Sequence, residues 1–170
     1  TLRRDHLAPY GAPFETVAAS RLAREGVLFE HAVSPVPLTL PSHASLFTGL
    51  LPPHHGVRDN GSFVVSAGLT TLAERFRERG YRTAAFVSSY IVHSRWGLAQ
   101  GHETYDDSFD YSGLESRNLA DLERPAGEVV DVTLAWLRQP RRGDRPFYLW
   151  VHLYDPHEPY EPPDEYRRRA

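Results

Sequence analysis

The hydrophobic and polar positions of the chain fall into three segments, each of which predicts a helix followed by a strand. In the first segment, apolar residues recur at helical spacing, Gly26 follows as a stop, and the apolar run at residues 27–33 predicts a strand. The helical positions are Phe14, Val17, Ala18 and Leu22.

The second segment opens with a capping-box pattern, because Thr71 is followed three residues later by Glu74. Gly80 ends the helix, and the apolar residues 83–87 predict the next strand.

The third segment has an apolar stripe at residues 129–137, which predicts a helix that Pro140 ends. We expect a polar turn at residues 141–144 and a strand at the almost continuously apolar residues 147–153. Residues 95–125 show weak periodicity and many polar side chains, so we expect a long loop that runs over the sheet.

Helices that alternate with strands, and strands that are apolar throughout, indicate a mostly parallel sheet with helices on both faces. The predicted fold class is therefore α/β. With 170 residues and 41% hydrophobic content, the chain has enough material for one globular domain or part of one. It contains no Met and begins with a polar run, so we interpret it as a fragment.

Composition excludes several classes of function. A net charge of −3 is not typical of general nucleic-acid or membrane-surface binders, which carry a basic excess, so we expect a small substrate. The absence of Cys excludes disulfides, thiolate zinc sites and a cysteine nucleophile. No apolar run approaches the length of a membrane span, and nothing in the sequence fixes the localisation.

Ligands of parallel α/β sheets bind beyond the carboxyl ends of the strands, which directs attention to the residues after Val33 and Leu153. After Val33, Ser42 is a candidate N-cap of a short helix whose backbone N–H groups would lie near Thr39 and hold an anion. A hydroxyl group there suits attack on a phosphate or sulfate ester. The alternative is that Thr39 is a turn residue and Ser42 only a cap.

Other polar residues carry weaker expectations. His157 follows the last predicted strand and is either an active-site residue or a residue that shapes its proline-flanked loop. Asp155 either orients His157 or starts a turn, and we favour the turn. We expect His152 to be a satisfied core residue. One of His54 and His55 could face the site, but we expect both to shape a loop. The three residues that follow the Gly-Val pair either reach substrate or form a solvated turn; they are Arg58, Asp59 and Asn60.

Residues 39–57 closely resemble the sulfatase signature, which runs Cys or Ser, any residue, Pro-Ser-Arg, small residues, Leu-x-Thr-Gly and a later Pro-x-x-His-Gly-Val. The opening residues 1–11 resemble the continuation of that family's first metal-binding strand. Residues 154–160 resemble its Pro-His-x-Pro-Tyr loop. The resemblance covers the chain in order.

This resemblance implies an alkaline phosphatase-like α/β sandwich, of which residues 1–170 form the N-terminal portion, truncated at both ends. It implies a hydrolase, or a transferase, of phosphoester or sulfate ester substrates, with Thr39 as nucleophile and His157 in contact with the ester or leaving group. Ser42 and His43 would bind substrate. A divalent metal is expected, Zn or Ca, Mg or Mn, with Thr39 as one ligand and the others outside this stretch.

Two positions depart from the signature. Formylglycine is made by oxidising Cys or Ser to an aldehyde, whereas oxidation of Thr39 would give a ketone. The superfamily's phosphodiesterases use Thr directly in a similar Thr-x-Pro context, so Thr39 fits phosphoester or phosphonate cleavage better than sulfate ester cleavage. His43 replaces the signature Arg, and a neutral imidazole is a poor substitute for guanidinium.

Three hypotheses follow from the sequence. The first is a metal-dependent ester hydrolase acting on a small-molecule, carbohydrate or lipid ester, without nucleic acid and without a membrane segment in this stretch. The second is a non-catalytic relative that binds an anionic or carbohydrate ligand, and a true sulfatase is a variant of the first. The third is a structural half-domain with exposed sheet edges.

Overall fold

The computed structural model describes residues 2–112, 115, 118–140, 145–160, 162 and 164–167. The chain divides into two compact units: Thr1–Ser34 together with Asp155–Ala170, and Pro35–Tyr154. Thr1 and the turn expected at residues 141–144 lie outside the described residues.

The larger unit contains a sheet of three strands in the order β2-β1-β3. The strands are β1 (Arg82–Val87), β2 (Thr104–Asp106) and β3 (Phe147–His152). Both pairings are parallel, and the β1–β3 ladder places Val87 beside His152 at its carboxyl end. The predicted parallel sheet is confirmed.

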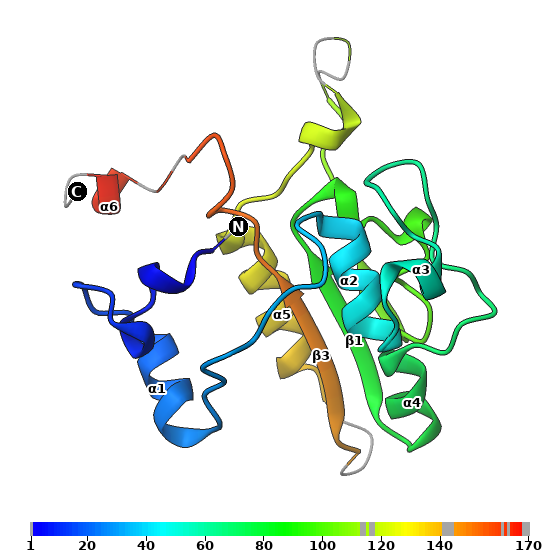
Figure 1. Ribbon diagram of the computed structural model, residues 1–170, viewed down its shortest axis with the longest axis horizontal. Coiled ribbons are helices and arrows are strands. Elements are labelled where there is room, and N and C mark those ends of the chain that lie inside the picture. Colours follow the sequence, from blue (N-terminus) through cyan, green and yellow to red (C-terminus); the bar gives the residue numbers. More distant parts are fainter. Residues whose placement is uncertain are drawn as a thin grey trace. The chain divides into compact units, whose positions relative to one another are not determined.

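Helices cover both faces of this sheet (Figure 1). On one face, α5 (Ala126–Arg138) packs its Val129 and Trp136 against Phe86 of β1. On the other face lie α2 (Thr39–Thr48) and α4 (Leu72–Glu78). The alternation of side chains along β1 and β3 supplies both faces, as expected for a strand buried on two sides.

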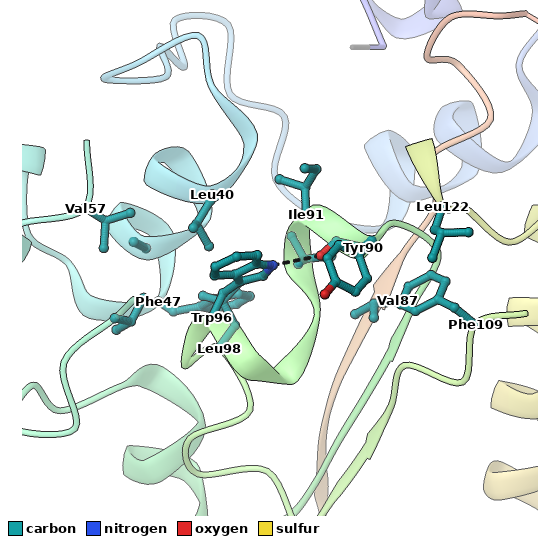
Figure 2. Packing of buried hydrophobic residues seen from close by; sticks show 13 residues of the cluster. Leu40, Phe47, Val57, Val87, Tyr90, Ile91, Trp96, Leu98, Phe109 and Leu122 are labelled. Carbon is teal, nitrogen blue, oxygen red and sulfur yellow. Dashed lines mark hydrogen bonds between the residues drawn. The ribbon is translucent and has the colours of Figure 1, made fainter. Parts of the chain in front are cut away.

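The core on the α2 side gathers residues from α2 and from the loops that follow β1 (Figure 2). Leu40 and Phe47 of α2 pack with Trp96 and Leu98, and the indole Nε1 of Trp96 donates to the backbone oxygen of Tyr90 over 2.9 Å. This core fixes α2 over the sheet, and with it the position of Thr39 at the first turn of the helix.

Shorter elements complete both units. The first unit has η1 (Arg4–His6), η2 (Ala8–Tyr10), α1 (Val17–Glu25) and α6 (Asp164–Arg167). The second unit adds α3 (Pro52–His55), η3 (Tyr90–Val92), η4 (Ser94–Trp96) and η6 (Leu119–Asp121). Over the described ranges, no helix combines the length and apolar character needed to cross a membrane.

Two secondary-structure predictions are wrong. Residues 27–33 form no strand, and Val27, Phe29 and Val33 are 77%, 69% and 90% exposed. A strand exists only through its ladder, and the described sheet consists of β1, β2 and β3 without this segment. Residues 95–125 are not only a loop, because they contain β2, which is too short for its periodicity to be read from sequence.

The predicted ends of two helices and the predicted cap of a third are confirmed. Helix α1 ends at Glu25 with Gly26 as its C-cap, and α5 ends at Arg138, before Pro140, as expected. The capping box at the start of α4 is confirmed, since the Thr71 hydroxyl accepts from the Glu74 N–H over 3.2 Å and Glu74 accepts from the Thr71 N–H over 2.8 Å.

The loop before β2 is hydrogen-bonded to this capping box. Gln100 Nε2 donates to the Glu74 carboxylate over 2.8 Å, and the Thr71 hydroxyl donates to the Gln100 carbonyl over 3.0 Å. The following Gly101 has a φ of 89° and its carbonyl accepts from the Thr83 hydroxyl over 2.8 Å. A Cβ at Gly101 would lie 2.4 Å from the backbone nitrogen of Glu74, so only glycine fits.

We expect Gly101→Ala to lower the free energy of unfolding by roughly 3 kcal/mol or more, because it combines an unfavourable positive φ with a backbone clash. Gly61→Ala is the matched control: Gly61 has a φ of 75°, but a Cβ there meets nothing within 4 Å, so its cost should stay near 1–2 kcal/mol. Urea unfolding of both variants measures the difference, and equal losses would contradict the steric argument.

Candidate active site

The carboxyl edge of the parallel sheet brings side chains from two neighbouring strands together. Ser89 and Tyr154 each lie two residues beyond a strand end, and those ends, Val87 and His152, are paired in register. Burial raises the pKa of the Tyr154 phenol, and the nearby side chains of Thr39 and Ser89 partly oppose this rise. Thr39 therefore lies at the edge where ligands of parallel sheets bind.

Thr39 is the first residue of α2, and the start of this helix is capped from a distance. The side chain of the N-cap residue Leu38 makes no capping bond, and the amide oxygen of Asn60 instead accepts from the Leu40 N–H over 2.9 Å. Asn60 thus performs the task usually left to a neighbouring Ser, Thr, Asp or Asn. Neither of the roles expected for Asn60, substrate contact or solvated turn, describes this bond.

The capping leaves few donors for the expected anion site. The Leu40 N–H is taken by Asn60, Pro41 has no N–H, and the Ser42 N–H donates to the Leu38 carbonyl over 3.1 Å. The expectation that several N–H groups of the first turn would hold an anion is therefore wrong, because the sequence places a proline and a remote amide where free donors were needed.

Ser42 and His43 both act on the backbone of Thr39. The Ser42 hydroxyl donates to the Thr39 carbonyl over 2.9 Å, so Ser42 lies inside the helix and is not its N-cap. The His43 Nδ1 lies 2.7 Å from the same carbonyl oxygen. Because a carbonyl only accepts, this nitrogen carries the hydrogen, and in the neutral ring Nε2 carries the lone pair.

The ring of His43 packs in a cluster of aromatic and imidazole side chains. The ring of His43 lies 5.5 Å from that of Trp150 and 5.2 Å from that of His152, and Tyr154 stacks on His152 at 5.7 Å. Burial lowers the pKa of His43, and burial together with the neighbouring His43 lowers the pKa of His152 to about 3. Both imidazoles are therefore neutral at neutral pH, and the site gains no cation from them.

His152 differs from its expectation in one respect. It is buried, as a core residue should be, but its Nδ1 has no hydrogen-bond partner among the described residues. The prediction of a satisfied core histidine is wrong on that point, because the ring is enclosed by other rings rather than by acceptors.

A buried arginine, Arg124, links the carboxyl ends of β1 and β2. The Nε and Nη2 of Arg124 donate to the Val87 carbonyl over 3.1 and 2.8 Å, and Nη1 lies 2.8 Å from the carboxylate of Asp106. Arg124 thus ties the ends of β1 and β2, and its charge is matched by Asp106. Sequence reasoning missed this pair, since it placed both residues in a loop.

The loop after α2 takes its shape from His55. This residue is buried, its Nε2 lies 2.9 Å from the Ser45 hydroxyl, and its Nδ1 accepts from the Val57 N–H over 3.1 Å. The expected structural role of His55 is confirmed, whereas His54 is exposed.

His157 belongs to the other unit and is half-buried there. Its Nδ1 donates to the Glu158 carbonyl over 2.9 Å, and its own carbonyl accepts from the Tyr160 N–H over 3.2 Å. These bonds show that His157 helps to shape its loop. Whether it acts on substrate stays a prediction.

The side chains around Thr39 do not complete a metal site. They are hydroxyls and neutral imidazoles, and the described part of the chain holds no group of three or more His, Cys, Asp or Glu placed to bind a metal ion. Hard divalent cations require several oxygen ligands, usually with carboxylates among them. Thr39 can be at most one ligand, and the described residues do not fit a complete centre.

Comparison with solved structures identifies the class of fold. The structure superposes on the phosphonate monoester hydrolase of Agrobacterium radiobacter with a TM-score of 0.77 at 23% identity, covering 99% of this chain and 42% of that chain. The architecture, a parallel sheet with helices on both faces, is that of the alkaline phosphatase-like fold, of which this chain forms part.

The sulfatase family model matches residues 1–170, so the chain belongs to the sulfatase family. It is 26% identical to the uncharacterized sulfatase YidJ of Escherichia coli over 92% of this chain and 36% of the relative. It is 34% identical to the delta 4,5-hexuronate-2-O-sulfatase of Bacteroides thetaiotaomicron over 84% of this chain and 29% of that protein. The chain thus spans about a third of the length of these curated relatives.

We expect Arg124→Met to destabilise the protein by about 3 kcal/mol, because it leaves the half-buried Asp106 carboxylate without its counter-ion and the Val87 carbonyl without its donors. Arg75→Met is the control: its pair with Glu78 is solvent-exposed, so its loss should cost under about 1 kcal/mol. Thermal or urea unfolding gives both values. Similar losses would show that Arg124 does not hold the strand ends.

Proposed function

We propose that the chain is the N-terminal portion of a sulfatase-family hydrolase that cleaves phosphoester or phosphonate ester bonds, with the Thr39 hydroxyl as nucleophile. The observation that carries the proposal is the place of Thr39. It opens α2 at the carboxyl edge of a parallel sheet and lies near Tyr154 there, in a chain that matches the sulfatase model throughout.

Two observations favour phosphoester or phosphonate cleavage over sulfate ester cleavage. A threonine side chain cannot become the aldehyde of formylglycine, so Thr39 must act, if it acts, through its own hydroxyl. The structural likeness to a phosphonate monoester hydrolase agrees with a phosphorus-centred reaction. Sulfate ester cleavage remains the alternative, because the curated relatives include a sulfatase whose name specifies a hexuronate 2-O-sulfate.

In the proposed reaction, Thr39 Oγ forms a bond to phosphorus and the bond to the ester oxygen breaks, so that the alcohol leaves with a proton. Water then attacks the phosphorus and releases Thr39 with its proton restored. His157 is proposed to contact the ester or its leaving group through the ring nitrogen that does not bond Glu158. Ser42 and His43 hold the backbone of Thr39, and any contact of these residues with substrate would come in addition.

The substrate we propose is a small-molecule, carbohydrate or lipid ester. The carbohydrate class is supported by the hexuronate named for one relative. Sulfatases are metal-dependent as a family, and we propose Thr39 as one ligand of a divalent metal, with the remaining ligands outside the described residues.

A second candidate function is ligand binding without catalysis. It is favoured by the two neutral imidazoles beside Thr39, because His43 stands where the sulfatase signature has an arginine and brings no positive charge to an ester anion. A protein of this kind would hold an anionic or carbohydrate ligand at the same edge without turnover.

We expect Thr39→Ala, in the complete protein that carries this chain, to lower kcat for an aryl phosphodiester by roughly 1,000-fold or more, because the nucleophile is lost. Thr48→Ala in the same helix is the matched control, since its hydroxyl donates to the Ala44 carbonyl and accepts from the Leu50 N–H, at the other end of the helix. Turnover is measured with an aryl phosphodiester and an aryl sulfate side by side, with and without a chelator.

The outcomes separate the alternatives. A phosphorylated peptide containing Thr39, seen by mass spectrometry after rapid quenching, would support the covalent step directly. Loss of aryl sulfate cleavage alone in Thr39→Ala would keep the nucleophile and change the substrate class. No chelator-sensitive turnover of either substrate by the unmodified protein would favour the binding function.

A further inference from the structure

A cavity of about 390 Å³ lies within the unit formed by Thr1–Ser34 and Asp155–Ala170. Its volume falls in the range of about 300–1,000 Å³ that is usual for small-molecule sites. The side chains that line it come from the start of the chain and from the loop around residue 157; they are Leu2, Arg3, His6, Pro156 and Tyr160. The cavity therefore offers room for a small ligand or for one ring of a larger ligand.

The cavity borders His157 along the chain. Pro156 directly precedes this histidine, and the Tyr160 N–H donates to the His157 carbonyl over 3.2 Å, so both lining residues belong to the same turn as His157. In the proposed reaction, His157 contacts the ester or its leaving group. A leaving group held by His157 would therefore adjoin the wall that Pro156 and Tyr160 form.

The apolar wall of the cavity is built around Tyr160. Its side chain is 65% exposed, and its backbone has a φ of 56°, which is unfavourable for a residue with a large side chain. Backbone conformations of this kind cluster at binding and catalytic sites, where the surrounding structure holds them. Together with Pro156 and Leu2, the phenol ring offers an apolar face on which a flat ring can stack.

The arginine of the opposite wall is matched by a carboxylate. The Nε and Nη2 of Arg3 donate to the two carboxylate oxygens of Asp5 over 2.9 and 2.6 Å, the paired geometry of strong arginine–carboxylate contacts. Hydrogen bonds from Arg3 and His6 hold the pKa of Asp5 well below its usual range, so Asp5 is ionised at neutral pH. Arg3 is therefore neutralised and offers little attraction to a further anion.

The third polar group of the cavity accepts rather than donates. The Nδ1 of His6 lies 3.0 Å from the Asp5 carboxylate, which only accepts, so this nitrogen carries the hydrogen. In the neutral ring, Nε2 then keeps its lone pair for a ligand hydroxyl. An apolar wall, a neutralised arginine and a hydrogen-bond acceptor suit an uncharged ring and do not suit a second anionic group.

We infer that this cavity binds the leaving group of the substrate as an uncharged ring, aryl or sugar, and that Tyr160 is a specificity-determining residue. The inference rests on the proposed function, because it takes from it the contact between His157 and the leaving group. It adds the chemical class of that group and the side chains that select it.

The test compares three phosphodiesters in the complete protein that carries this chain, with Thr39→Ala introduced to prevent turnover. Phenyl methyl phosphate and the methyl diester of glucose 6-phosphate carry a ring, whereas dimethyl phosphate carries none. We expect Tyr160→Asn to weaken the binding of a ring-bearing probe by about 10-fold in calorimetric titrations, and to leave dimethyl phosphate within about two-fold. Asn is chosen because it tolerates a positive φ.

Two further variants control this comparison. Tyr160→Phe keeps the ring and should bind all three probes within about two-fold of the parent. Tyr166→Asn removes a tyrosine that is 56% exposed in the same unit but is not among the described residues that line the cavity, so it should change nothing. A loss confined to the phenyl probe assigns an aryl leaving group, and a loss for the glucose probe assigns a sugar.

The charge balance of the cavity has a test of its own. A carboxylate on the ring, as in 4-carboxyphenyl methyl phosphate, should not strengthen binding while Asp5 neutralises Arg3. Asp5→Asn should strengthen the binding of this probe by about five-fold and leave the phenyl probe within about two-fold, because it frees the guanidinium charge. Tighter binding of the carboxylate probe than of the phenyl probe before this change would contradict an uncharged leaving group.

Three results would overturn the inference. They are equal binding of all three probes before Tyr160 is changed, an equal effect of Tyr160→Asn on all three, and a similar loss in Tyr166→Asn. Turnover of the Thr39→Ala protein keeps the two proposals apart. If turnover is abolished and Tyr160→Asn binds every probe as before, only the leaving-group cavity fails, whereas full activity of Thr39→Ala removes the proposed function itself.

Discussion

The parallel ladder between β1 and β3 is the constraint on which the site depends. Its register sets Val87 beside His152, and each residue beyond those ends is thereby placed at the same edge. Ser89 and Tyr154 lie near one another because both are two residues past the ladder. A shift of the register by one residue would turn the side chains of β3 to the opposite face and separate this pair.

The side chains next to Thr39 explain why this polar site has no unmatched positive charge. His43, His152 and Trp150 pack ring against ring, and burial holds both imidazoles neutral. The one arginine that ties the strand ends, Arg124, is matched by Asp106 and bonded to the Val87 carbonyl. His43, His152 and Arg124 therefore bring no unmatched positive charge to the surroundings of Thr39.

Membership of the sulfatase family and these local departures from its signature are compatible. The family model covers the whole chain, while the chain covers about a third of the length of its curated relatives. Thr39 and His43 are the two positions at which the chain differs most in chemical character from the signature, and they touch one another through the Thr39 carbonyl.

Sequence alone determined the features that depend on local physics. The helix at α4 follows from its capping box, α1 and α5 follow from apolar stripes with a glycine or proline stop, and β1 and β3 follow from continuous apolar runs. The motif around Thr39 also identified the family, and with it the candidate nucleophile.

Tertiary structure decided what depends on distant partners. The strand β2 exists only through its ladder with β1, and residues 27–33 show that an apolar run without such a ladder stays irregular. Asn60 caps a helix twenty residues away, and Tyr154 lies near Thr39 although more than a hundred residues separate them. No local pattern encodes a hydrogen bond between elements that only the packed sheet brings together.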